Sequence, residues 1–157
     1  MNQPTNQRNL AKLEKLRKPK TGFLSQASFG MTIVAIITMI MCIMFGLVAF
    51  DLLSGIEYSL GVVLAFIGYA LVILFGILGI IFGATGRSAA IYYNLKLRRM
   101  KVDHTLNQSI TAFDKAKIFN TPPASTTVPL VTILISAGAI IIATLNIVLM
   151  FTVGNLI

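Results

Sequence analysis

The stretch LGVVLAFIGYALVILFGILGIIFGA, residues 60–84, decides the fold, because it runs for 25 residues without a charged side chain. Two further stretches have the same character, residues 29–50 and residues 129–151. At 1.5 Å per residue, about 20 helical residues cross the roughly 30 Å hydrocarbon core of a bilayer. Lipid offers no partner for backbone amides, and these stretches lack the polar alternation of a barrel strand. The sequence therefore predicts an all-α protein with three transmembrane helices.

The composition supports the same class. Of 157 residues, 56% are hydrophobic and 11% are charged, whereas about a quarter of the residues of a soluble domain are charged. Thirteen Lys and Arg against five Asp and Glu give a net charge of +8. One Cys excludes an internal disulfide, and one Cys with one His cannot build a zinc site within one chain. We therefore expect no metal and no cofactor.

The basic residues predict the topology. Six precede the first apolar stretch and seven lie between the second and the third, which accounts for all thirteen. Because Lys and Arg are retained on the cytoplasmic side of a membrane, both segments are expected there. The prediction is a cytoplasmic amino-terminal segment (1–28), an extracytoplasmic loop (51–59), a cytoplasmic loop (85–128) and an extracytoplasmic tail (152–157).

Small side chains recur every three or four residues along one face of the second stretch. They let helix backbones approach each other, and helix association in lipid depends on packing and hydrogen bonds. The contact can be with the other helices of the chain or with another chain, and the pattern leaves both open. The predicted helix-packing residues are Gly61, Ala65, Gly68, Gly76, Gly79 and Gly83. Similar faces are formed by Ala35, Thr38, Cys42, Gly46 and Ala49 in the first stretch, and by Thr132, Ser136, Ala139, Ala143 and Asn146 in the third.

Polar chemistry within the three stretches is sparse. None contains Asp, Glu, Lys, Arg or His, the residues that mark proton relays, ion pathways and coupled transport. This argues against a secondary transporter or a proton pump. Tyr69 and Asn146 are the sizeable polar side chains in mid-span, and the predicted topology puts both in the outer half of the membrane. They can bond to each other, or each can bond within its own helix.

The cytoplasmic segments are predicted to be partly helical and interfacial. Residues 9–18 place leucines every three residues among basic ones, which is typical of a short amphipathic helix. Residues 88–102 mix tyrosines and leucines with basic residues, as at a membrane interface. Asp103 is a candidate N-cap for a second helix. Residues 120–129 contain three prolines and predict an irregular connector.

The basic run between the second and third stretches is the best candidate for an interaction surface. Anionic lipid headgroups attract juxtamembrane basic residues by about 1 kcal/mol each. A cytoplasmic protein partner is the alternative, while nucleic acid is not expected because no motif or aromatic platform supports it. The residues of this candidate surface are Lys96, Arg98, Arg99 and Lys101.

The sequence contains few residues that could support catalysis. His104 stands alone in a polar segment, and a general base needs an oriented partner. Cys42 lies in mid-membrane, where a thiol usually serves as small packing volume. Asp51 and Glu57 have no nucleophile or basic partner near them in the sequence. We expect no catalytic residues and no enzymatic activity.

Residues 71–87 end in Phe-Gly-Ile-Leu-Gly-Ile-Ile-Phe-Gly-Ala-Thr-Gly-Arg. This ending resembles the close of the second helix in small, functionally unassigned bacterial membrane domains built from two glycine-rich spans. The resemblance covers residues 29–101, and the third stretch and the long basic loop depart from it. It implies a bacterial cytoplasmic membrane and no known reaction.

These observations lead to one expectation of function and two alternatives. We expect a non-enzymatic accessory, assembly or scaffold subunit of a membrane complex, in contact with anionic lipids and with other membrane subunits or copies of itself. A homo-oligomeric pore is the first alternative, with Thr132, Ser136 and Asn146 as its candidate lining. A protective protein that confers immunity to a membrane-active peptide is the second, because such a protein is also small, basic and poor in sites.

Overall fold

The structure, a computed structural model, consists of three long helices. It describes residues 11, 22–52, 56–106, 116 and 118–154. The helices are α2 (Phe23–Leu52), α3 (Ile56–Leu106) and α5 (Thr127–Gly154). All three are long and apolar enough to cross a membrane. The predicted all-α fold with three such helices is therefore confirmed for this part of the chain.

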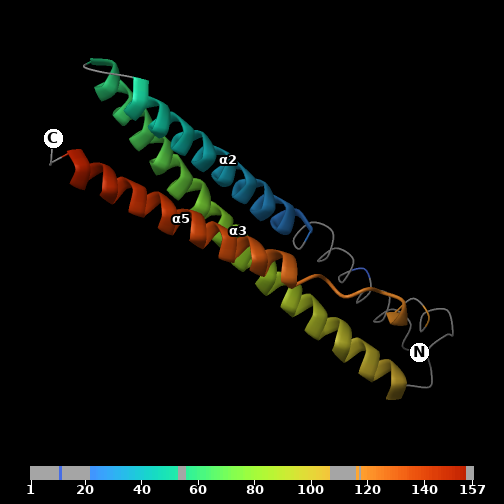
Figure 1. The fold of residues 1–157 in the computed structure, drawn as a ribbon. Coiled ribbons are helices and arrows are strands. Elements are labelled where there is room, and N and C mark those ends of the chain that lie inside the picture. The colour runs from blue at the N-terminus through green and yellow to red at the C-terminus, as the bar shows by residue number, and fades with distance from the viewer. Residues whose placement is uncertain (1–10, 12–21, 53–55, 107–115, 117, 155–157) are drawn as a thin grey trace.

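The three helices form one elongated bundle. α3 runs antiparallel to α2 and to α5 and packs against both along their length, and α2 and α5 also touch each other (Figure 1). α3 extends beyond its two neighbours at one end of the bundle. Residues 118–126 contact this end of α3 and lead into α5 (Figure 1).

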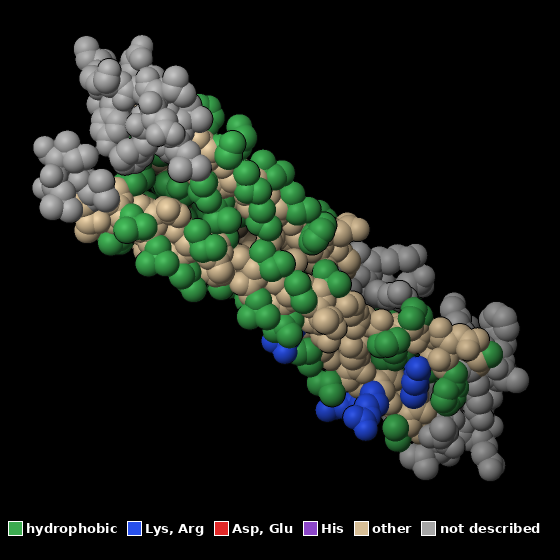
Figure 2. All heavy atoms as spheres, viewed as in Figure 1, with side chains coloured by type: hydrophobic (Ala, Val, Ile, Leu, Met, Phe, Trp, Pro, Cys, Tyr) green, Lys and Arg blue, Asp and Glu red, His purple; other side chains and the backbone are tan. Residues whose placement is uncertain are grey.

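The bundle interior is built from small side chains. Its buried cluster contains Ala35, Cys42, Ala65, Tyr69, Val72, Ala139 and Ala143. Large aliphatic and aromatic side chains point outward instead, and Figure 2 shows them spread over the surface of the helical bundle. This reverses the distribution of a soluble protein, in which large apolar side chains form the core. An apolar exterior around close-packed helices is the arrangement that a bilayer stabilises.

The helices are longer than the apolar stretches that predict them. α2 begins six residues before 29–50 and continues through Asp51 and Leu52. α3 begins at Ile56. Much of the predicted 51–59 loop is therefore helical. Hydropathy marks where the chain becomes polar, but a helix ends only where its backbone bonds end. All three helices therefore extend beyond the predicted spans at both ends.

The largest departure from the prediction concerns the segment after residue 84. α3 continues without interruption to Leu106 and has 51 residues, about 77 Å at 1.5 Å per residue. Asp103 lies inside this helix, so its predicted role as the N-cap of a separate helix is wrong. After Gly86 the segment contains no Gly or Pro, and its Ala, Leu, Lys and Arg residues favour a helix. Residues 87–106 of α3 are called the arm below.

We call residues 118–126 the connector. It contacts the arm and leads into α5. Residues 121–126 form no helix, as their prolines predict. α5 then begins at Thr127, with Pro129 in its first turn, where a missing N–H costs nothing. The amphipathic helix predicted for residues 9–18 lies outside the described residues, apart from Ala11.

Candidate functional site

Two features qualify as a functional site, a polar core where the helices meet and the basic arm beyond it. The glycines of α3 make the first possible. A Cβ added at Gly79 would lie 2.6 Å from Ser136 Oγ and 3.3 Å from Thr32 Oγ1, and one added at Gly83 would lie 2.7 Å from Ile133 Cγ1. The distances of 2.6 Å and 2.7 Å are shorter than real Cβ contacts allow. α3 can therefore approach α2 and α5 this closely only with glycine at these positions.

The other predicted packing residues of α3 lie on the same inward side. A Cβ at Gly76 would meet Ile140 Cγ1 at 2.7 Å, and one at Gly68 would collide with Cys42 Sγ. Ala65 is buried and Gly61 is half-buried. These contacts are made with α2 and α5 of the same chain.

Four hydroxyl groups from α2 and α5 meet against the glycine face of α3. Ser28 Oγ donates to the carbonyl oxygen of Gly79 at 2.9 Å and lies 2.8 Å from Thr132 Oγ1. Thr32 Oγ1 donates to the carbonyl oxygen of Ser28 at 2.8 Å and lies 2.9 Å from Ser136 Oγ. All four side chains are at most 2% exposed. We call Ser28, Thr32, Thr132 and Ser136 the hydroxyl cluster.

Every hydroxyl group of the hydroxyl cluster can donate a hydrogen bond to an acceptor within the protein. Thr132 Oγ1 can also donate to the carbonyl oxygen of Pro129, at 2.9 Å. Ser136 then donates to Thr32, so each of the four protons has an acceptor inside the protein. A buried polar group with its partners made carries no desolvation penalty and fixes the relative position of the helices. The chemistry of this cluster is structural, and it joins all three helices near the base of the arm.

Sequence reasoning missed half of this cluster. Ser28 falls just outside the predicted first span, and Thr32 was not assigned to the small-residue face of that span. A signal existed, because Ser28 and Thr32 are four residues apart, as are Thr132 and Ser136. Thr38, which was assigned to the face, donates to Val34 O within its own helix instead.

The two polar residues predicted in mid-span are not joined to each other. Asn146 Nδ2 donates to the carbonyl oxygen of Ile142 at 3.0 Å, one turn back in α5. Tyr69 is buried in the core cluster of small side chains. Of the two possibilities that the sequence left open for Asn146, the structure shows the local bond.

The second feature is the basic arm. The four residues of the predicted basic surface lie on it, but they differ in exposure and contacts. Arg98 and Arg99 are exposed, whereas Lys96 is half-buried. Lys101 Nζ donates to the carbonyl oxygen of Phe119 at 3.2 Å and so contacts the connector. Figure 2 shows the described basic side chains at one end of the bundle, over the part of α3 that extends beyond α2 and α5.

The connector packs against the side of the arm that carries Tyr93, Asn94, Leu97 and Met100. The Asn94 side chain makes a two-sided contact, with Nδ2 donating to Ala124 O at 2.9 Å and Ala124 N donating to Asn94 Oδ1 at 2.8 Å. Tyr93, Leu97 and Met100 form a buried cluster against Ala124. The connector thus covers one side of the arm, whereas the described side chains of Ile91, Leu95 and Val102 on the arm are exposed.

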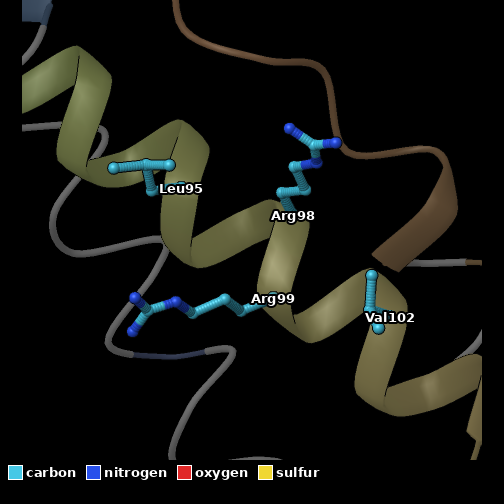
Figure 3. A pocket seen from close by; sticks show the side chains of 4 residues that line it. All are labelled: Leu95, Arg98, Arg99 and Val102. Carbon is cyan, nitrogen blue, oxygen red and sulfur yellow. The ribbon is translucent and has the colours of Figure 1, made fainter.

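The exposed side of the arm has an apolar line between basic residues. Ile91, Leu95 and Val102 lie along it and are 43%, 52% and 51% exposed. Leu95, Arg98, Arg99 and Val102 line a shallow hollow of about 360 Å³ (Figure 3). In this view Arg98 points toward the connector and Arg99 points the other way, so the two guanidinium groups do not converge on one point. We call Ile91, Leu95, Arg98, Arg99 and Val102 the arm face.

The described residues form no candidate metal centre. They contain no group of three His, Cys, Asp or Glu residues that could hold a metal ion. Cys42 is a free, buried thiol in the core cluster. The arm face is therefore the candidate for binding, and the hydroxyl cluster is its support.

Comparison of the chain with protein-family models, curated proteins and solved structures finds no match in any of the three. The fold and the two features define the chain as a multi-pass helical membrane protein with a basic helical arm.

Proposed function

We propose that the protein is a non-enzymatic accessory, assembly or scaffold subunit of a membrane complex. The observation that carries the proposal is the continuity of α3 from the apolar bundle into the arm. A helix that is anchored by two partners in the membrane presents the arm in a fixed direction. Binding through a preorganised surface costs less ordering entropy than binding through a mobile segment.

The packing within the bundle supports this role. The hydroxyl cluster and the glycine face occupy the interior, so the bundle is held together without a second chain. Its described exterior consists mainly of large apolar side chains suited to lipid. Among the described residues, recognition by polar groups then falls to the arm, whose positive charge favours the cytoplasmic side. The membrane that we propose is a bacterial cell membrane, as the resemblance of residues 29–101 implies.

The pore alternative is disfavoured by the same contacts. Its candidate lining includes Thr132 and Ser136, which are 2% and 0% exposed and bonded to α2. A pore formed by several copies needs these hydroxyl groups to face a shared channel. They would have to leave satisfied hydrogen bonds to do so.

The test is purification of the tagged full chain in native nanodiscs at its native expression level, followed by mass determination. A parallel preparation from cells that express the untagged chain identifies proteins retained nonspecifically. We expect a foreign chain in a fixed ratio to this protein. A homogeneous self-assembly that conducts ions in liposomes would contradict the proposal and favour the pore, and a lone monomer would also contradict it.

A further inference from the structure

We propose that the arm face docks an acidic, amphipathic helix of another protein in the aqueous phase beyond the lipid headgroups. The inference rests on the proposed function and names the chemistry of its partner. It follows from the position of the arm relative to the membrane, from the pattern of side chains on the arm face, and from its charge.

The position of the arm separates Arg98 from the lipid surface. The stretch of α3 between Glu57 and Arg87 is free of charge, and the hydrocarbon core must lie within it. Arg98 follows Arg87 by 11 residues, which is about 16 Å along a helix. The headgroup layer on each side is only about 5–7 Å thick. Even at a tilt of about 40°, the upper end of the usual range, Arg98 stays about 13 Å past Arg87.

The arm cannot reach the headgroups by bending without losing contacts. Sharp helix kinks need a proline, an inserted side chain or a similar local defect, and Figure 1 shows α3 straight where it leaves the bundle. The bonds from Asn94 to Ala124 fix the arm to the connector, which leads directly into α5. These contacts therefore hold the arm parallel to the axis of the bundle.

The pattern of the arm face is that of a helix-binding seam. Ile91, Leu95 and Val102 are separated by four and seven residues, the spacing at which apolar side chains form a stripe on a helix. Arg98 lies on one side of this stripe and Arg99 on the other (Figure 3). A partner helix with an apolar stripe between acidic residues matches this arrangement on both sides. The diverging guanidinium groups do not suit a single phosphate, which would need them to converge.

The charge of the arm disfavours the arm of a second copy as the partner. Among the described side chains of the arm, residues 87–102, there are five basic residues and no acidic one. Two such arms placed face to face would bring arginine against arginine, and like charges at a helix seam are destabilising. An acidic helix removes this repulsion and gains charge-assisted contacts at both edges.

The first test locates the arm face. A nitroxide is attached to Leu95→Cys in a Cys42→Ala background of the full chain, in nanodiscs that contain anionic phosphatidylglycerol. Leu74→Cys, exposed on the apolar part of the same helix, is the matched control. We expect the label at 95 to respond to a water-soluble nickel chelate and the label at 74 to dissolved oxygen. A lipid-like response at 95 would overturn the proposal and assign the arm face to anionic lipid, and dipolar broadening between copies would assign it to a second copy.

The second test measures binding of a defined probe. The probe is a three-heptad helical peptide with Leu at its a and d positions and Glu at e and g, and its control carries Lys at e and g. We expect the Glu peptide to bind the nanodisc-embedded chain, and Arg99→Glu or Leu95→Asp to weaken it by roughly tenfold or more. Lys96→Glu makes the same charge change as Arg99→Glu at a half-buried position outside the arm face, and should leave affinity within about twofold.

Three results of the peptide experiment would contradict the docking site. They are no binding of the Glu peptide up to millimolar concentration, equal binding of the Lys peptide, and equal losses in Arg99→Glu and Lys96→Glu. The label at 74 reports whether each variant keeps its fold. A foreign chain that co-purifies equally with wild type and Arg99→Glu would leave the accessory role intact and remove only this site.

Discussion

At the residue scale, the glycines of α3 matter by what they exclude. Gly79 faces Ser136 and Thr32 so closely that even a methyl group has no room, whereas nothing lies within 4 Å of a Cβ at Gly138. Gly79→Ala should therefore destabilise the bundle by about 1–3 kcal/mol, the usual cost of overpacking. Gly138→Ala fills open space and should leave stability unchanged or raise it by up to about 1 kcal/mol. Unfolding of both variants in detergent micelles checks this, and equal stability would mean that the close approach of the helices is not as described.

The polar side chains give a second residue-scale prediction, which compares two pairs. Ser28 and Thr132 are hydrogen-bonded across helices, whereas the Asn146 amide bonds within α5. A double-mutant cycle with Ser28→Ala and Thr132→Val should yield a coupling of about 0.6 kcal/mol, the average for membrane hydrogen bonds. The cycle with Tyr69→Phe and Asn146→Leu should yield none. Coupling in the second pair and none in the first would reverse the assignment of the polar contacts.

At the element scale, the Asn94 side chain makes two of the hydrogen bonds that hold the connector to the arm. Asn94→Ala removes both the donor and the acceptor that bind the backbone of Ala124. Each bond contributes about 0.5–1.5 kcal/mol, so the amide of Ala124 should exchange with solvent deuterium markedly faster. Ser88→Ala, an exposed change on the same helix, is the control and should leave exchange unchanged. Unaltered protection of Ala124 in Asn94→Ala would show that the other contacts, the apolar cluster and the bond from Lys101 to Phe119, hold the connector without Asn94.

The extent of the helices shows where reading the sequence succeeds and where it stops. Residues 60–84 predict a spanning helix because only backbone bonds within the segment are stable in lipid. The same argument says nothing after Arg87, where water can satisfy the backbone and helix or loop is decided by propensity and tertiary contacts. The tertiary contacts of the arm come from far along the chain, through Ala124 and Phe119. The sequence therefore predicted helix in the arm, but it did not predict that this helix continues α3 without a break to Leu106.

The candidate sites follow the same division. The glycine face could be predicted because its period is visible within one helix. The hydroxyl cluster could be predicted only in part, because the four-residue spacing of each pair is visible within α2 or α5, whereas the pairing between the two helices joins residues such as Ser28 and Thr132, which are 104 residues apart. The basic run was visible as a composition, but only the packing of the connector separates Arg99, which is exposed, from Lys101, which is bonded to it.

At the scale of the whole molecule, charge and shape predict one orientation. The described basic side chains gather at the end of the bundle from which the arm extends (Figure 2), and no Lys or Arg follows Lys117. Because basic segments are retained in the cytoplasm, the arm should lie inside and the end of α5 outside. The antiparallel course of α3 and α5 requires these two ends to be on opposite sides.

Paired reporters test this orientation. Alkaline phosphatase fused after Ile157 should be active, because it folds only outside the cytoplasm, and a fluorescent protein fused there should be dark. The matched control is a chain ended after Val102, where the same two reporters should give the opposite readings. A fluorescent fusion after Ile157 would place the end of α5 in the cytoplasm and contradict the three-span topology. Since the docking of an acidic helix by the arm face requires the arm and its partner on one side of the membrane, this result also decides in which compartment such a partner must be sought.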